Sequence, residues 1–505
     1  MNTTQGSQPK SPGRHMLHGS FWMILLRWTI RLIGLVSTVI LARLLTPADF
    51  GVVAMAMIVV GMLEILSQSG QRLAIIRLAH PTKDDYDTAW TISVFVGLTI
   101  GACILAIAPF TEAYFHEPSA VVVMRFLALR SILGGFENIG VVDFRRDIRF
   151  DRFFRYNAIP KAVSFVVTVS LAWYLRNYWA LVAGIITSQI TSTILSYAMH
   201  PYRPRFSLAK LPYLRAFSGW TLLRSIGIYL NAQMDQIAIG GIAGVSSMGR
   251  YSVASDVAAS PSREINDPLI TVLYSVLSKL QGEPTQLRAL YLRAIGWSAV
   301  ICTSTSVGVA LVAPEMVSLV LGPKWHDVVP LMAWLALSAG TLGIGSGTYT
   351  LFDAIGKPHV GARMQWVRLI LLAVAIFPAA ILTRSLVAIA QVRLAVTLVF
   401  LPTLFFAAGR EAGISARDYV SVLWRPLASA ALMVLVVRLA DLVIPLADTR
   451  KLAFDILVGI ISYTGSLHLL WTMSGRPATP ERDILGFLKS GHKKIAMLTA
   501  GSNGP

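Results

Sequence analysis

Arginine residues lie inside long apolar stretches of this chain, where a charged side chain needs a wet cavity or a partner. Arg27 and Arg31 are one helical turn apart, and with Gly34 and Thr38 they form a polar or small face on an apolar segment. Arg130 lies near the middle of another apolar segment, where a charge is costly unless it is hydrated or paired. A guanidinium group binds phosphate through two parallel hydrogen bonds. These positions therefore predict a cationic surface for an anion, and phosphate fits it.

A second polar face runs along residues 216–241. Thr221, Arg224, Asn231 and Asp235 follow helical spacing, which places four polar side chains on one side of the segment. Lipid would not tolerate such a stripe, so it predicts a cavity lining or a buried network between helices.

Prolines mark the segment that carries Arg263. Pro261 and Pro268 each remove a backbone donor and predict a kinked or broken helix. Broken helices at membrane depth are common at transport sites, which makes Arg263 a binding candidate. A local ion network with Glu264 and Asp267 is the alternative.

The remaining candidates are one arginine, three acids and a lysine. Arg393 lies deep in its segment and is a further binding candidate. Glu64 is expected either to pair with a basic residue of the first segment or to carry a proton. Glu137 is expected to share a helix face with Arg130, and Asp235 is, like Glu64 and Glu137, a coupling or ion-pair candidate. Lys161, one turn from a segment end, is expected to reach toward the membrane edge.

The segments that hold these residues define the fold class. Of the 505 residues, 55% are hydrophobic and 14% charged, and the mean hydropathy is +0.62. Blocks of about 20 continuous apolar residues are long enough to cross a bilayer as helices and too long for barrel strands. We therefore predict an all-α polytopic membrane protein with fourteen spans, at residues 21–43, 47–67, 88–109, 119–139, 153–175, 178–199, 216–241, 250–277, 290–313, 328–350, 360–382, 386–407, 426–446 and 452–472.

Basic residues alternate between the connections and predict the orientation. The two tails and the even-numbered connections, with the span ends beside them, hold 28 of the 44 Lys and Arg residues, whereas the odd-numbered connections hold 7. The positive-inside rule then places both termini in the cytoplasm. The net charge of +18 is therefore a topology signal, and we expect no nucleic-acid partner.

The chain carries a weak internal echo. Gly51 and Ala56, just after the first span, recur as Gly249 and Ala254 after the seventh, so six spans separate the copies and the halves are parallel repeats. We predict a disordered cytoplasmic tail (1–20), an N-terminal six-helix lobe (21–199), a cytoplasmic linker (200–215) and a C-terminal six-helix lobe (216–407). A second cytoplasmic linker (408–425), two extra helices (426–472) and a cytoplasmic tail (473–505) follow.

Several enzyme motifs do not occur in this sequence. It has no G-x-x-x-x-G-K-[ST] phosphate loop, no H-E-x-x-H and no paired-cysteine pattern, so neither ATP, a metal nor another cofactor is expected. No connection is long enough for a folded catalytic domain. We expect a protein that is not an enzyme.

Five short motifs, in order along the chain, resemble the polysaccharide transporter (oligosaccharide flippase, Wzx-like) family of the multidrug/oligosaccharidyl-lipid/polysaccharide exporter superfamily. The resemblance extends over most of the chain, roughly residues 20 to 410. The motifs are Leu41 to Ala56 (LARLLTPADFGVVAMA), Asn231 to Gly240 (NAQMDQIAIG), Gly249 to Ala254 (GRYSVA), Leu321 to Trp325 (LGPKW) and Ala354 to Pro358 (AIGKP).

The resemblance implies two six-helix lobes around a central cavity, with two extra C-terminal helices. It implies flipping of a polyprenyl-pyrophosphate-linked oligosaccharide across a bacterial inner membrane, without ATP, for exopolysaccharide, capsule or O-antigen export. The partners would be this lipid-linked oligosaccharide, membrane lipids, and the polymerase and glycosyltransferases of such a system.

Three alternatives remain open from sequence. A flippase of the peptidoglycan precursor would share the cationic cavity. A drug/cation antiporter of the same superfamily would concentrate acids in its cavity, and the surplus of arginine counts against it. A non-transporting scaffold of a polysaccharide assembly complex would tolerate loss of the charges at Arg130 or Arg224.

Overall fold

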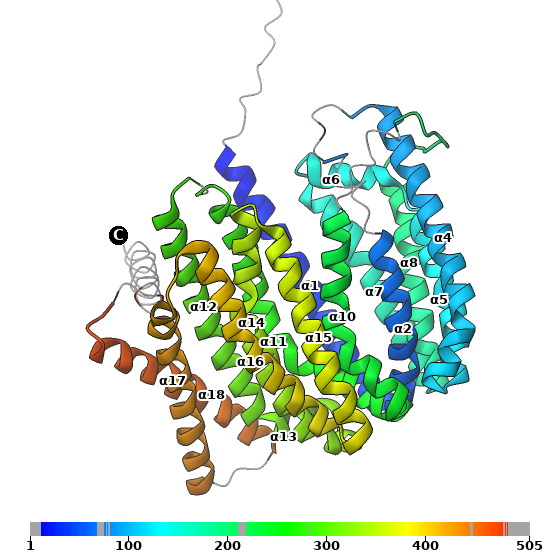
Figure 1. The fold of residues 1–505 in the computed structure, drawn as a ribbon. Coiled ribbons are helices and arrows are strands. Elements are labelled where there is room, and N and C mark those ends of the chain that lie inside the picture. Colours follow the sequence, from blue (N-terminus) through cyan, green and yellow to red (C-terminus); the bar gives the residue numbers. More distant parts are fainter. Residues whose placement is uncertain are drawn as a thin grey trace, which may run out of the picture. The chain divides into compact units, whose positions relative to one another are not determined.

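The structure, a computed structural model, describes residues 12–67, 75–76, 78, 81–210, 219–280, 282–444, 448–477, 480 and 482. The side chains of 12–20, 66–67, 219–221 and 448–449 are outside this description, and so is the Thr221 side chain of the predicted polar face. Most of the predicted C-terminal tail, 473–505, also lies outside it. Figure 1 shows a molecule built of helices, in agreement with the predicted fold class.

The chain divides into two compact units, Met1–Gly249 and Arg250–Pro505. The helices of the first unit are α1 (Pro12–Leu44), α2 (Pro47–Ser67), α4 (Lys83–Phe115), α5 (Pro118–Gly135), η1 (Ile139–Val142), α6 (Asp143–Arg146), α7 (Phe150–Leu175), α8 (Trp179–Met199) and α10 (Gly219–Ile242). Helix α11 (Val245–Leu277) begins in the first unit and continues into the second.

The second unit contains three short helical turns and the remaining long helices. They are α12 (Pro284–Leu311), α13 (Ala313–Met316), η2 (Val317–Leu321), η3 (Pro323–Val328), α14 (Val329–Ala354), α15 (Pro358–Thr383), α16 (Leu386–Ala412), α17 (Ala416–Val443) and α18 (Asp448–Met473).

All fourteen predicted spans coincide with helices. In the described part, twelve helices are long and apolar enough to cross a membrane. The other two, α10 and α11, have 24 and 33 residues and are long enough but more polar. They are the helices for which the sequence predicts polar stripes and a proline-flanked charge cluster. The protein is a multi-pass membrane protein of about fourteen helices.

Four predicted boundaries or breaks differ from the structure. Helix α1 starts at Pro12, so residues 12–20 are helical and not a disordered tail; proline fits the first helical position because no intrahelical partner is lost there. Helix α5 stops at Gly135, which leaves Glu137 in the turn after the helix. The predicted shared helix face of Arg130 and Glu137 is therefore wrong. Helix α11 runs unbroken through Pro261 and Pro268, so of the predicted kinked or broken helix the broken alternative is wrong.

The fourth difference concerns the linker predicted at 408–425. Helix α16 extends to Ala412 and α17 starts at Ala416, so most of this segment is helical. The Ser415 hydroxyl and backbone N–H both donate to the Asp418 carboxylate, at 2.7 and 2.8 Å, and cap the start of α17. This capping box satisfies orphan backbone donors and lets the helix start before the apolar run.

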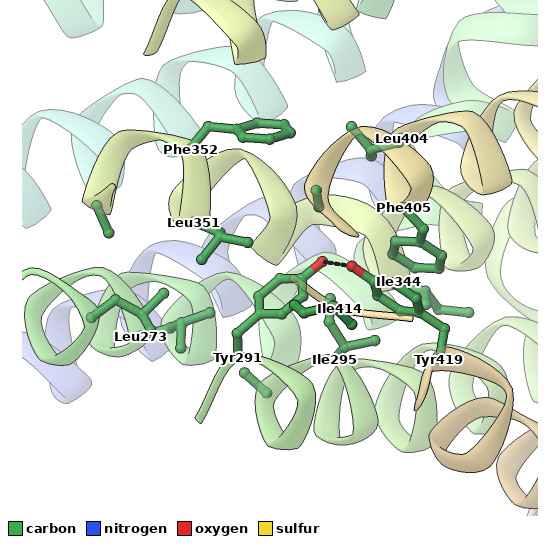
Figure 2. Packing of buried hydrophobic residues seen from close by; sticks show 14 of the residues in the cluster. Leu273, Tyr291, Ile295, Ile344, Leu351, Phe352, Leu404, Phe405, Ile414 and Tyr419 are labelled. Carbon is green, nitrogen blue, oxygen red and sulfur yellow. Dashed lines mark hydrogen bonds between the residues drawn. The ribbon is translucent and has the colours of Figure 1, made fainter. Parts of the chain in front are cut away.

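Buried aromatic and aliphatic side chains form the core of the second unit (Figure 2). Tyr291 of α12 is fully buried, and its hydroxyl lies 2.8 Å from that of Thr348 on α14. The Tyr419 hydroxyl of α17 donates to the Tyr291 hydroxyl at 3.3 Å, and the Phe405 ring of α16 stacks on Tyr419. The hydrogen bonds satisfy the buried hydroxyls and join α12, α14 and α17, and the ring stack adds α16.

The two glycines of the internal echo meet at a close helix crossing inside the first unit. A Cβ atom at Gly51 of α2 would lie 1.9 Å from the carbonyl oxygen of Val245 at the start of α11. A Cβ atom at Gly249 of α11 would lie 1.7 Å from the carbonyl oxygen of Pro47 at the start of α2. Both distances are far below van der Waals contact, so only glycine permits this approach of the two backbones.

Candidate functional site

Glu64 of α2 connects two neighbouring helices of the first unit. Its Oε2 atom lies 3.3 Å from the Arg130 Nη2 atom on α5, and the Ser131 hydroxyl donates to its Oε1 atom at 3.4 Å. The Arg130 and Glu64 side chains remain 30% and 24% exposed. The ion pair is therefore at a partly open surface, where Arg130 can still reach an additional anion.

Lys161 of α7 adds a second positive charge at this place. It is exposed and close enough to Arg130 for electrostatic repulsion between the two cations. The two positive charges of Arg130 and Lys161 exceed the single negative charge of Glu64, which leaves a positive excess within helices that are otherwise apolar. We define Glu64, Arg130 and Lys161 as the α2–α5–α7 charge cluster.

Helix α10 is fixed against α2 by a tyrosine. The Tyr229 hydroxyl donates to the carbonyl oxygens of Met57 and Ile58, at 3.2 and 2.8 Å. Tyr229 is also within electrostatic range of Glu64, so α10 borders the α2–α5–α7 charge cluster. Gly61 permits this contact, because a Cβ atom there would lie 2.5 Å from the tyrosine oxygen.

The predicted polar face of α10 has a half-buried and a buried part. Arg224 is half-buried, whereas Asn231 and Asp235 are 2% and 1% exposed. The Asn231 amide donates to the Gly227 carbonyl oxygen at 2.8 Å. The part of the face that carries Asn231 and Asp235 is thus a buried inter-helix region, one of the two outcomes that the spacing predicted.

Helix α1 packs on α7 and presents its predicted polar face near the surface. Arg27 is exposed and Arg31 half-buried, and the Trp22 ring packs on Phe154 of α7 with ring centroids 5.2 Å apart. The Thr38 hydroxyl donates to the Gly34 carbonyl oxygen at 3.0 Å, so this polar group is satisfied within the helix.

The other three predicted residues are in the turn after α5 and in the second unit. Glu137 is half-buried in the turn between α5 and η1. Arg263 of α11 is exposed, and Arg393 of α16 is half-buried; both belong to the second unit.

Sequence reasoning missed two members of the site. Lys161 was expected to reach the membrane edge, and its closeness to Arg130 depends on how α7 packs. Tyr229 carries no spacing signal, because a tyrosine in an apolar segment is indistinguishable from a core aromatic until its hydroxyl partner is known. Within the described residues, no group of three or more His, Cys, Asp or Glu side chains is arranged to hold a metal ion.

An apolar cavity of about 860 Å³ lies between α16 and α17 of the second unit. Its walls are leucine and aromatic side chains, among them Phe405, Phe406 and Trp424, and Arg410 lines it as well. The combination of an apolar wall and one cation suits an amphiphile.

A second polar cluster lies outside the spans, around Asp143 of α6. The Tyr86 hydroxyl donates to its Oδ1 atom at 2.5 Å, the His200 Nε2 atom lies 3.4 Å from its Oδ2 atom, and Arg146 is 3.3 Å away. Burial alone would raise the pKa of Asp143, but the hydrogen bonds from His200 and Tyr86 and the Arg146 charge outweigh it and lower that pKa. The carboxylate therefore joins α4, α6 and the segment after α8.

Comparison with known proteins supplies the family. The family model described as polysaccharide biosynthesis protein matches residues 40–330, more than half of the chain. The lipopolysaccharide biosynthesis protein WzxC of Escherichia coli is 22% identical, with 81% of this chain and 84% of that protein covered. The succinoglycan biosynthesis transport protein ExoT of Rhizobium meliloti is 24% identical, with 69% and 70% covered.

Solved structures show the same fold. The lipid II flippase MurJ, in its inward closed conformation, matches with a TM-score of 0.70 at 12% identity, with 91% of this chain and 100% of that chain covered. The sequence resemblance is thereby confirmed at the level of family and fold. This chain belongs to the polysaccharide biosynthesis protein family.

Proposed function

We propose that this protein is a flippase that moves a polyprenyl-pyrophosphate-linked oligosaccharide across the bacterial inner membrane by alternating access, for exopolysaccharide, capsule or O-antigen export. The observation that carries the proposal is the α2–α5–α7 charge cluster. Arg130 and Lys161 exceed Glu64 in charge, and all three side chains come from membrane-spanning helices. A pyrophosphate headgroup needs such a field to leave water.

The relatives support a lipid-linked cargo. WzxC is named for lipopolysaccharide biosynthesis, ExoT for succinoglycan biosynthesis and transport, and MurJ as a flippase of lipid II. A flippase only has to hide the polar headgroup from hydrocarbon, since the tail can stay in the bilayer. In the second unit, the lipid tail could pack against the apolar lining of the α16–α17 cavity, and Arg410 could bind an acidic group of the cargo.

The proposed site extends beyond Arg130 to the other predicted cations. Arg27, Arg31, Arg224, Arg263 and Arg393 would meet the headgroup in one aqueous cavity, and Glu64, Glu137 and Asp235 would serve in coupling or ion pairs. Two six-helix lobes, at 21–199 and 216–407, would move around this cavity. Both termini would be cytoplasmic, and the protein would perform no covalent chemistry and use no ATP.

A drug/cation antiporter is the main competitor by fold, because a multidrug transporter of the superfamily matches with a TM-score of 0.62. A cationic drug would be repelled by the excess of Arg130 and Lys161 over Glu64, so the charge sign favours an anionic cargo.

The test replaces Arg130 in a strain whose polymer export depends on this protein. Arg130→Ala removes both the charge and the two-pronged geometry and should abolish export; Arg130→Lys keeps the charge and should only reduce it. Arg125→Ala is the matched control, because Arg125 is an exposed arginine on the same helix. Export and membrane levels of each variant are measured together.

Two results would contradict the proposal in different ways. Normal export by both variants would make Arg130 structural and would place the pyrophosphate elsewhere. Failure of Arg130→Lys as complete as that of Arg130→Ala would show that bidentate geometry, and not the positive field, dominates.

A further inference from the structure

Three carboxyl groups and a lysine meet where α13, α17 and α18 of the second unit come together. The Lys451 Nζ atom of α18 lies 2.6 Å from the Glu315 Oε1 atom of α13 and 4.0 Å from the Asp441 Oδ1 atom of α17. Asp455, one turn after Lys451 on α18, is 4% exposed and Glu315 is 7% exposed. Burial of these acids is costly unless each charge is compensated.

Two of the buried carboxyl oxygens have no hydrogen-bond partner among the described residues. They are the Oδ1 atom of Asp455 and the Oε2 atom of Glu315. Asp455 also lines a cavity of about 460 Å³ among α11, α12, α17 and α18. An unsatisfied buried carboxylate oxygen beside a cavity is a place where a bound cation would lower the free energy.

The carboxyl groups of Asp455 and Asp441 lie within hydrogen-bonding reach of each other. A carboxylate only accepts hydrogen bonds, so this pair can be bonded only when one member carries a proton. Two such groups this close cannot both stay ionised without a strong mutual repulsion.

The charges around Asp455 also indicate that the cluster binds one proton. Helix α17 contributes Asp441 and Arg438, which are 3.9 Å apart, α13 contributes Glu315, and α18 contributes Lys451. Among the described residues that line the cavity, Asp455 is the sole charged one; α12 offers the hydroxyls of Ser304 and Thr305. Three acids against two bases leave one negative charge, which a single proton neutralises.

We propose that Asp455, paired with Asp441, is an exchangeable proton-binding site at the junction of α13, α17 and α18. Binding converts one carboxylate to a carboxyl group and needs no other reactant. Protonation balances the charges that hold α18 to α17 and α13, and release leaves an uncompensated negative charge among them. The proposal does not depend on the cargo, because proton binding is measured on the purified protein.

Infrared difference spectroscopy tests the site on the full chain in detergent, buffered without sodium. The wild-type protein should show a protonated-carboxyl band that is lost reversibly as the pH rises. Asp455→Asn should lose this band. Asp327→Asn should keep it, because that acid is 72% exposed on the surface of the same unit.

Two variants of neighbouring residues give a second test that does not depend on the folding of Asp455→Asn. They should shift the pH at which the carboxyl band is lost in opposite directions. Lys451→Met removes a nearby positive charge, so the proton should be held to higher pH. Glu315→Gln removes a nearby negative charge, so the proton should be lost at lower pH. A variant of structural effect alone would not produce this opposed pair of shifts.

The proposal is overturned by a wild-type spectrum without a pH-dependent carboxyl band that depends on Asp455. It is also overturned if the band appears but neither Lys451→Met nor Glu315→Gln moves it. Thermal stabilisation by sodium that Asp455→Asn abolishes, with no titrating band, would assign the site to sodium instead.

Discussion

At the residue scale, Glu64 sets how much positive charge the first unit presents. Its carboxylate is shared between Arg130 and the Ser131 hydroxyl, while Lys161 approaches Arg130 from another helix. An acid that compensates one of two cations lets both be placed in the membrane without removing the field for an anion.

Asp143 provides a pH-dependent test of the polar cluster outside the spans. Its lowered pKa means that the folded state holds the carboxylate more strongly than the unfolded chain does. The stability that the Asp143 carboxylate contributes is fully present at pH values above its ordinary pKa of 3.8, and it is lost as the pH falls through the lower pKa of the folded state. At neutral pH, Asp143→Asn should therefore cost about 1.5–3 kcal/mol, the range for a hydrogen-bonded charge.

Thermal unfolding of the detergent-solubilised protein over an acid titration measures the effect. The stability difference between wild type and Asp143→Asn should shrink as the solution is acidified, whereas Asp84→Asn, an exposed acid of the same region, should match wild type throughout. A difference that stays constant with pH would show that Asp143 acts through packing and not through its charge.

The sequence singles out candidate residues, but it does not identify their neighbours. Helical spacing and the cost of buried charge are enough to single out Arg31, Arg130 and Arg224. The sequence does not identify the partner of Glu64. A basic residue of the first span was one candidate, whereas the structure pairs Glu64 with Arg130 of α5. Pairing depends on which helix faces which, and hydropathy carries no such information.

At the element scale, the approach of α2 and α11 depends on glycine. Gly249→Ala would place a methyl group 1.7 Å from the Pro47 carbonyl oxygen, and backbone cannot yield as a flexible side chain does. We expect a loss of stability of about 1–3 kcal/mol, the usual cost of overpacking. The measurement is the thermal midpoint of the purified variant.

Gly465→Ala is the control for this substitution. A Cβ atom at Gly465 of α18 would meet no atom of the described residues within 4 Å, so alanine there should be neutral or should stabilise the protein by about 0.5–1 kcal/mol through helix propensity. Equal effects of the two substitutions would contradict a specific role for the crossing.

Helix positions followed from hydropathy, and helix ends did not. Fourteen apolar runs gave fourteen helices, yet α17 starts ten residues before its predicted span because Ser415 and Asp418 cap it. The stop of α5 at Gly135 and the passage of α11 through two prolines depend on local bonds and packing that apolar length does not record. Pro261 is one wall of the Asp455 cavity, a tertiary setting that sequence does not contain.

At the scale of the whole molecule, the orientation in the membrane is open to direct test. The bias of 28 against 7 basic residues predicts that reporter fusions after residues 112 and 250 report the outside, and fusions after 147 and 208 the inside. Alkaline phosphatase and green fluorescent protein fusions give complementary readouts at each position. An inside reading after residue 112 would invert the proposed map, and Asp455 would then exchange its proton with the cytoplasm.

The crossing at Gly51 and Gly249 also means that the two positions are energetically coupled. Each glycine meets the first turn of the helix that carries the other, so one outward displacement of the two helices would make room for a side chain at either position. The cost of Gly51→Ala and Gly249→Ala together should therefore be smaller than the sum of the two single costs, because the displacement is made only once.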